Sequence, residues 1–173
     1  MLGERIFTIA RMGALCVAAL LCGGTAWGLE DWSQWRGANR DAKVTGSNVR
    51  GKDSAYDAAN LIDGRRDTAW ATDDEVHVAY AMLEFKRPVA FSVIAVKEDI
   101  RYGQRVDAFA VEHSNAGNWE QLAAGTSIGP RKYIRLDRPV TASRVRLRVT
   151  KASASPVLTQ FSLFSEPPDA SAR

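Results

Sequence analysis

Cysteine and histidine are scarce in this sequence. The 173 residues contain two cysteines, Cys16 and Cys22, and two histidines, His77 and His113. Zinc sites need several such residues at short spacings, and the sequence has no such cluster. Beyond residue 28 there is no cysteine. That part of the chain therefore has neither a disulfide nor a catalytic thiol.

A long apolar run is also missing. The run near the amino terminus, residues 12–22, has about the length of a signal-peptide core and is short for a membrane span. Arg5 and Arg11 precede or flank it, and small residues occupy positions −3 and −1 before a cleavage site after Gly28. We therefore predict a signal peptide over residues 1–28 and a secreted or periplasmic mature chain with no transmembrane segment.

Two alternatives to simple cleavage are disfavoured. Lipidation requires a small residue before the acceptor cysteine, whereas Leu15 and Leu21 precede the two cysteines. An uncleaved anchor would require a longer apolar run.

A strong excess of charge is absent as well. The formal net charge is only +3. Nucleic-acid binding usually needs a concentrated basic stripe with interleaved aromatic residues, so we expect no nucleic-acid partner. The residues beyond position 28 are enough for one domain with its own core.

What the chain does have is the sequence pattern of an all-β protein. Short apolar runs recur between clusters of Gly, Pro, Asn and Asp, and residues 144–149 alternate strictly between arginine and aliphatic side chains. This pattern predicts about eight strands in a two-sheet sandwich, with one helical turn at residues 58–62. The predicted strands include residues 80–85, 91–97, 106–113, 119–123, 132–137, 144–149 and 157–164.

The remaining segments lack this pattern. Residues 29–46 show neither helical nor strand periodicity, and we interpret them as a lead-in arm carrying Trp32 and Trp35. The tail, residues 166–173, contains two prolines and is predicted to be disordered.

The run Ala-Asn-Leu-Ile-Asp-Gly at residues 59–64, followed by Thr-Ala-Trp at 68–70, resembles the signature of discoidin domains. These are also called factor 5/8 type C domains and belong to the galactose-binding-like superfamily. Further segments resemble the version appended C-terminally to bacterial α-L-fucosidases: residues 70–74, 102–106, 125–129 and 140–148. The resemblance covers about residues 47–164 and implies a domain at 47–165. It implies an eight-stranded jelly-roll-like β-sandwich whose loops at one end bind ligands, usually sugars.

The resemblance also implies a module without chemistry of its own. The fucosidase reaction belongs to a separate (β/α)8 barrel of roughly 250 residues. Glycoside hydrolysis needs two carboxylates about 5 to 10 Å apart, whereas the adjacent Asp73 and Asp74 would face opposite ways in a strand. We therefore predict an exported, non-catalytic carbohydrate-binding module. Two alternatives stay open: an interaction or adhesion module for a cell-envelope protein, which the two arm tryptophans favour, and a non-catalytic remnant of a fucosidase-like hydrolase.

Family members often hold a structural calcium ion near the Asp-Gly turn. Asp63 and Thr68 keep the matching positions here, and Asp67 can add a carboxylate. However, Arg65 stands where a second aspartate is common, and Gln160 stands where a glutamate is usual. We expect Arg65 to replace the ion by pairing with Asp63. The alternative is that Arg65 points into solvent while a weaker calcium site persists.

Charged, amide and aromatic side chains gather in residues 98–105, and sugar recognition uses this mixture of groups. The alternative is that Gln104 and Arg105 brace the loop. Trp70 is predicted to lie in the core. The predicted ligand-binding residues are Asp73, Asp74, Glu98, Arg101, Tyr102, Gln104 and Arg105.

Arg144, Arg146 and Arg148 share one side of their predicted strand. Such a basic face could bind a sulfated or uronic-acid polysaccharide. The interpretation that we favour is a solvated face paired across strands with Glu112, Glu120 or Asp107.

Overall fold

The computed structural model describes residues 38–165. The predicted signal peptide, Trp32, Trp35 and the tail lie outside these residues. The described part forms seven strands: β1 (Lys43–Gly46), β2 (Trp70–Ala71), β3 (Ala79–Glu98), β4 (Val106–Asn115), β5 (Asn118–Gly125), β6 (Lys132–Ala152) and β7 (Val157–Phe164). Its helices are short 3-10 turns: η1 (Ala38–Asp41), η2 (Arg50–Lys52), η3 (Ser54–Tyr56), η4 (Ala58–Leu61) and η5 (Ile100–Tyr102). No helix in the described part has the length and apolar character needed to cross a membrane.

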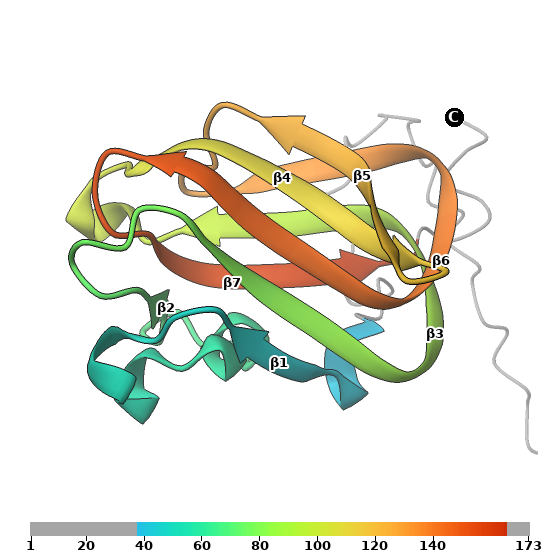
Figure 1. Ribbon diagram of the computed structural model, residues 1–173, viewed down its shortest axis with the longest axis horizontal. Helices are drawn as coiled ribbons and strands as arrows, with labels where there is room; N and C mark the ends of the chain where they lie inside the picture. Colours follow the sequence, from blue (N-terminus) through green and yellow to red (C-terminus); the bar gives the residue numbers. More distant parts are fainter. Residues whose placement is uncertain (1–37, 166–173) are drawn as a thin grey trace, which may run out of the picture. The chain divides into compact units, whose positions relative to one another are not determined.

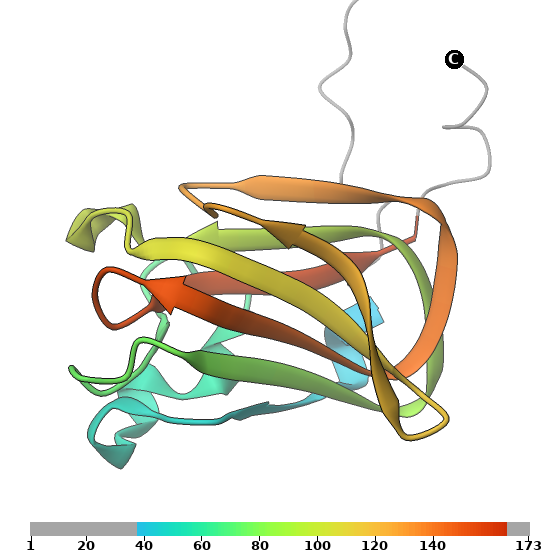
Figure 2. The same ribbon diagram turned by 45° about the horizontal axis from the view of Figure 1, so that its top comes forward.

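The strands pair antiparallel in two layers (Figures 1 and 2). One layer contains β1, the first half of β3, the second half of β6, β4 and β5. The other contains β2, β7, the second half of β3 and the first half of β6. This arrangement confirms the predicted all-β sandwich.

Two strands pass through both layers. β3 has 20 residues and β6 has 21, and their pairing shifts register between Glu84 and Val89. The predicted strands 80–85 and 91–97 are therefore the two halves of β3, and 132–137 and 144–149 are the two halves of β6. The exposed residues at 86–88 interrupt the alternation of burial, which is why the sequence pattern predicts two strands where the backbone forms one.

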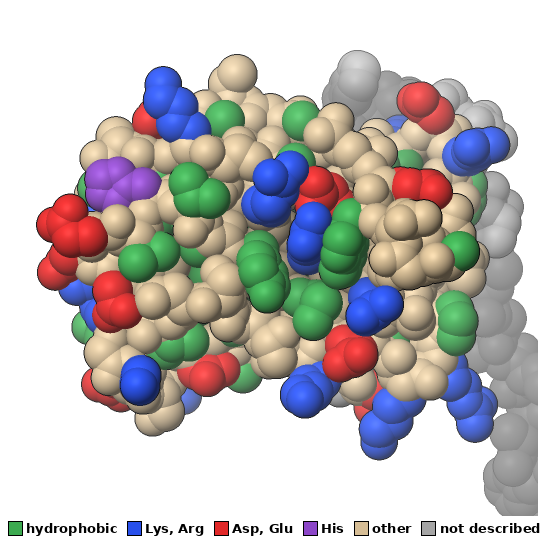
Figure 3. Space-filling model, in the orientation of Figure 1, with side chains coloured by type: hydrophobic (Ala, Val, Ile, Leu, Met, Phe, Trp, Pro, Cys, Tyr) green, Lys and Arg blue, Asp and Glu red, His purple; other side chains and the backbone are tan. Residues whose placement is uncertain are grey.

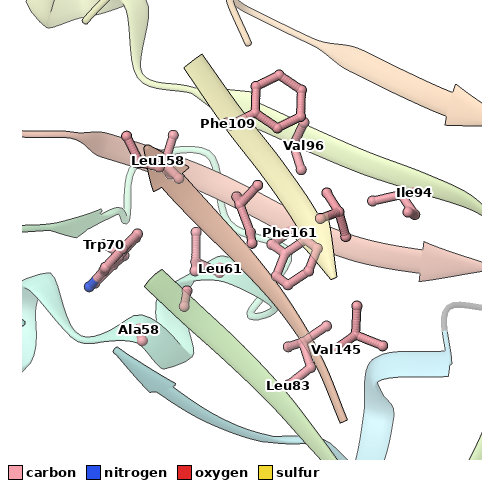
Figure 4. Close-up of a cluster of buried hydrophobic side chains, with 14 of the residues drawn as sticks. Ala58, Leu61, Trp70, Leu83, Ile94, Val96, Phe109, Val145, Leu158 and Phe161 are labelled. Atoms are coloured by element: carbon pink, nitrogen blue, oxygen red, sulfur yellow. The ribbon is translucent and has the colours of Figure 1, made fainter. Parts of the chain in front are cut away.

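The core lies between the layers (Figure 4). Val145, Leu147 and Val149 are fully buried, as the alternation in β6 predicts. Trp70, also fully buried, donates its indole Nε1–H to the carbonyl oxygen of Asn48 at 2.9 Å. The predicted core position of Trp70 is thus confirmed.

The folded part begins earlier than the sequence suggests. β1 lies within the predicted arm, and its residues 43–46 pair with residues 81–84 of β3. The buried Asn39 of η1 donates its amide to the carbonyl oxygen of Phe161 at 3.2 Å and accepts from the backbone N–H of Leu163 at 3.2 Å. Four residues are too few to display an alternation, so β1 left no recognisable signal.

Most of the connecting loops gather at one end of the sandwich, whereas the turn between β4 and β5 lies at the other (Figure 1). Figure 1 shows η5, the β6–β7 loop and the segments around η2, η3 and β2 at the left. η1 and the end of β7 lie at the opposite end. Segments far apart in sequence therefore meet at the left-hand end.

Candidate ligand-binding site

The buried side chain of Glu98 stabilises the loop between β3 and β4 through hydrogen bonds to the backbone. This side chain is 3% exposed, and its carboxylate accepts hydrogen bonds from the backbone N–H groups of Arg105, of Val106 at 2.9 Å and of Gly129 at 3.2 Å. Glu98, which we predicted to contact a ligand, is thus buried in the structure and braces the loop.

Arg101 is also engaged within the loop. Its guanidinium donates to both carboxylate oxygens of the buried Asp99, at 2.8 and 2.6 Å, and its backbone N–H donates to the same carboxylate at 3.2 Å. The hydrogen bond from the Arg101 side chain holds the pKa of Asp99 below its ordinary value, against the opposing effect of burial. This ion pair fixes the start of η5.

A hollow of about 200 Å³ lies beside this loop, and two residues of the loop, Tyr102 and Arg105, line it. It is lined by Arg50, Tyr56, Ala71, Asp74, Tyr102, Arg105 and Val157. The structure thus brings together three of the predicted residues, from segments about 30 residues apart. Asp73, Glu98, Arg101 and Gln104 are not among the residues that line it.

Two arginines meet the same serine at the rim of the hollow. Arg105 donates from Nη1 to the carbonyl oxygen of Ser155 at 3.0 Å and from Nε to the carbonyl oxygen of Tyr102 at 3.1 Å. Arg50 donates to the hydroxyl of Ser155 at 3.1 Å and forms an ion pair with Asp74. Arg105 therefore both braces the loop and lines the hollow, so the two interpretations of this residue are compatible.

Asp73 turns away from the hollow to hold a neighbouring turn. Its carboxylate accepts from the backbone N–H of Gly51 at 2.7 Å and from the amide of Asn48 at 2.8 Å. These two hydrogen bonds, the one from Gly51 first, keep the pKa of Asp73 below its ordinary value. Asp73 and Asp74 therefore have different partners, and Asp73 positions the segment that carries Arg50.

The hollow combines donors, one acceptor and aromatic surface. The guanidiniums of Arg50 and Arg105 supply planar donors, and Asp74, with its side chain 78% exposed, supplies a carboxylate. The residues Tyr56 and Tyr102 are 37% and 57% exposed. Asp74 is the one carboxylate among the lining residues, so this hollow holds no pair of carboxylates for acid–base chemistry.

Arg50 and Tyr56 are the functional candidates that the sequence did not reveal. They lie in short 3-10 turns between β1 and β2, where no periodic pattern exists. Arg50 reaches the hollow because the loop after β6 places Ser155 beside it, a contact across 105 residues. The sequence feature that could have identified them is the presence of an arginine and a tyrosine near turns that contain aspartate, and this feature is too common to be specific.

Protein donors occupy both carboxylates of the Asp-Gly turn. Arg65 pairs in bidentate fashion with Asp67, at 3.2 and 2.8 Å, whereas Asp63 accepts from the Thr68 hydroxyl at 2.7 Å and from the backbone N–H of Arg65 at 2.8 Å. The predicted Arg65–Asp63 side-chain pair is therefore wrong in its partner. Both carboxylates are occupied by donors, and no metal-binding cluster of three or more acidic, histidine or cysteine residues occurs within residues 38–165. The Arg65 guanidinium on Asp67 does not fit a calcium site, because it takes both oxygens of the carboxylate that the ion would need among its six to eight oxygen ligands.

Arg144, Arg146 and Arg148 form an arginine face on β6, and two of them share a carboxylate of the neighbouring strand β4. The 7% exposed Glu112 accepts from Arg146 at 2.6 Å and from Arg148 at 2.9 Å, and the Arg146 guanidinium lies 4.1 Å from the ring centre of Trp119. Burial raises the pKa of Glu112, but the two arginines outweigh this effect and lower it. Figure 3 shows positive, negative and apolar side chains intermixed on this side. The favoured interpretation, pairing with Glu112, agrees with these contacts.

Comparisons with known proteins agree with this architecture. Residues 42–161 match the family model of the F5/8 type C domain. Alpha-L-fucosidase 1 of Arabidopsis thaliana is 30% identical over 130 residues, which are 73% of this chain and 26% of that protein. This chain therefore spans about a quarter of the length of the curated relatives that it matches.

Solved structures show the same relationship. A putative alpha-L-fucosidase from Bacteroides thetaiotaomicron superposes with a TM-score of 0.72 at 26% identity, covering 77% of this chain and 29% of that chain. Chitosan-binding module 1 from a Paenibacillus sp. IK-5 chitosanase/glucanase superposes with a TM-score of 0.66 at 16% identity, covering 75% and 99%. The latter similarity is one of fold alone.

The lowered pKa of Asp99 predicts an acid-sensitive contribution to stability. A carboxyl group whose pKa is lower in the folded chain than in the unfolded chain stabilises the fold at pH values above its ordinary pKa, which is 3.8 for Asp99. This contribution is lost as the pH falls through the lower pKa of the folded state. Asp99→Asn should lower the free energy of unfolding at pH 7 by about 1 to 3 kcal/mol. Urea denaturation between pH 2 and 7 should show the difference from the unaltered chain shrinking towards pH 2. The exposed Asp137→Asn serves as control, and a constant difference at all pH values contradicts the assignment.

The occupied carboxylates at the Asp-Gly turn predict indifference to calcium. Thermal melts with EDTA and with added calcium should agree to within about 1 °C, because an ion that is not bound adds no stability. A rise of several degrees with calcium would show that the Arg65–Asp67 pair opens to admit the ion.

Proposed function

The chain belongs to the F5/8 type C domain family, and from this membership we propose that it is an exported, non-catalytic carbohydrate-binding module. The observation that carries the proposal is the hollow at the loop end, where Tyr102, Arg105, Arg50 and Asp74 converge. The relatives are named as fucosidases, so fucose-bearing glycans are the first ligands to test.

The chemistry of the hollow suits a sugar. Arg50 and Arg105 have further N–H groups besides those bonded to Ser155, Tyr102 and Asp74, and these can donate to sugar hydroxyls, while the Asp74 carboxylate can accept from others. The exposed tyrosine rings offer apolar surface to the C–H face of a pyranose. A volume of about 200 Å³ accommodates one sugar ring, with the rest of a glycan extending into solvent.

Binding without turnover is supported by the single carboxylate. Asp74 has no second carboxylate opposite it among the lining residues, and its own oxygen is engaged by Arg50. Both retaining and inverting glycosidases use two. The competing interpretation, a module for an envelope protein, has no comparable support, because Trp32 and Trp35 lie outside the described residues.

The ring of Tyr102 provides the sharpest test. Tyr102→Ala should weaken binding of a glycan identified on a fucose-rich array at least tenfold, because it removes the most exposed aromatic surface of the hollow. Isothermal titration calorimetry measures the loss. Ile100→Ala is the matched control: Ile100 is 51% exposed on the same 3-10 turn but does not line the hollow.

The outcomes separate the candidate functions. Loss of affinity in Tyr102→Ala with the melting temperature retained, and full affinity in Ile100→Ala, supports sugar binding. Absence of any bound glycan, together with co-purification of an envelope protein, would replace sugar binding with the adhesion function.

Export is tested at the new amino terminus. When the full sequence is expressed in a bacterium with a secretory pathway, the exported chain should begin at Leu29 by intact-mass measurement, since cleavage is predicted after Gly28. Recovery of the chain from the cytoplasm with residues 1–28 intact contradicts export.

A further inference from the structure

A second hollow, of about 480 Å³, lies beside the Asp-Gly turn and the paired ends of β3 and β7. Its charged lining residues are all cations, namely Arg65, Arg66, Lys97 and Arg131, and no aspartate or glutamate lines it. Lys97 lies opposite Gln160 across the β3–β7 pair, and both residues line the hollow.

Three of these cations lack a counter-charge. Arg65 is paired with Asp67, but within residues 38–165 no ion pair is made by Arg66, Lys97 or Arg131. Partial burial lowers the pKa of Lys97, and the positive charges of Arg131 and Arg66 add to this effect. The three cations line the same hollow, no carboxylate lines it to neutralise their mutual repulsion, and the Arg131 guanidinium has the uncharged ring of Tyr133 as its neighbour, 5.9 Å from the ring centre.

The arginine face shows what the fold does elsewhere with such charges. There, the buried Glu112 accepts from both Arg146 and Arg148, so two neighbouring guanidiniums share one internal carboxylate. Nothing comparable lines the second hollow. Its positive charge is left available for an anion from outside.

The uncharged residues that line the hollow indicate the size and the chemical class of the anion that would fit it. Leu61, Ile62 and Pro130 supply apolar surface, and Thr159, Gln160 and Ser162 supply hydroxyl and amide groups. A small inorganic ion would leave most of 480 Å³ unfilled. A ring with hydroxyl groups and one attached oxyanion uses both parts of the lining.

We propose that this second hollow binds an acidic saccharide unit, with Arg66, Lys97 and Arg131 holding its sulfate or carboxylate group. The two arginines suit paired oxygens of the oxyanion, and the lysine adds a point charge. The site is separate from the hollow of Tyr102, since the two share no lining residue. It gives the domain a second contact along an anionic glycan.

Calorimetric titration with three oligosaccharides of equal length tests the proposal: a sulfated glycosaminoglycan fragment, an oligogalacturonate and a neutral β-glucan fragment. At 50 mM salt, at least one acidic ligand should bind and the neutral one should not compete with it. The affinity should fall at 300 mM salt, because the contact is between charges. The sulfated and carboxylated arms identify which oxyanion the hollow prefers.

Matched variants locate the contact. Arg66→Gln and Lys97→Met should each weaken binding of the acidic ligand about tenfold or more, because each removes one charge-assisted hydrogen bond. Arg87→Gln makes the same charge change at an exposed arginine in the bend of β3, and should alter affinity less than about twofold. Tyr102→Ala should leave this binding intact, which separates the site from the proposed sugar hollow.

Two results would overturn the second site. One is equal weakening by Arg66→Gln and Arg87→Gln, which would reduce the effect to overall charge. The other is failure of both acidic ligands to bind while Tyr102 still contributes to glycan binding, which would leave the first hollow as the sole site.

Discussion

The antiparallel pairing of β3 with β6 is the constraint on which the rest of the structure depends. Both strands bend, so that each contributes one half to either layer, and their register runs from Ala79 opposite Val149 to Val96 opposite Lys132. Because the layers share these strands, their inner faces are held together over one core. The same path sends the connections that follow β3 and β6 back to a single end of the sandwich (Figure 1), and Tyr102 and Arg105 of the first hollow lie in the connection after β3.

At that end, buried polar groups hold the backbone while exposed ones remain for a ligand. Glu98 uses its carboxylate on three backbone N–H groups, and Asp99 uses its own on Arg101. These contacts satisfy groups that burial would otherwise leave costly. Tyr102 and Arg105 are presented on the loop that these two acids stabilise. Glu98 and Asp99 thus have a structural role, and the neighbouring Tyr102 and Arg105 are the candidates for ligand recognition.

The charges of the domain divide in the same way. Some are neutralised internally, as Glu112 neutralises Arg146 and Arg148, and others, such as Arg66 and Lys97, line a hollow without forming an ion pair among residues 38–165. A count of basic residues cannot distinguish these cases, because +3 is the sum over the whole chain. The distinction depends on which carboxylate lies within reach of which cation. Arg65 illustrates the point: two aspartates flank it, and the turn geometry gives it Asp67 and not Asp63.

The sequence by itself determined the β class, the inward alternation of β6, the burial of Trp70 and the family, because each follows from local periodicity or a contiguous motif. It also located Tyr102, Arg105 and Asp74 as candidates. Only the tertiary structure decided that Glu98 and Asp73 brace while Arg50 and Tyr56 line the hollow, and that β1 is a strand. Each of those outcomes involves a contact between residues more than 20 positions apart, such as Asp73 with Gly51, Glu98 with Gly129 and Arg50 with Ser155, and no local pattern encodes such contacts.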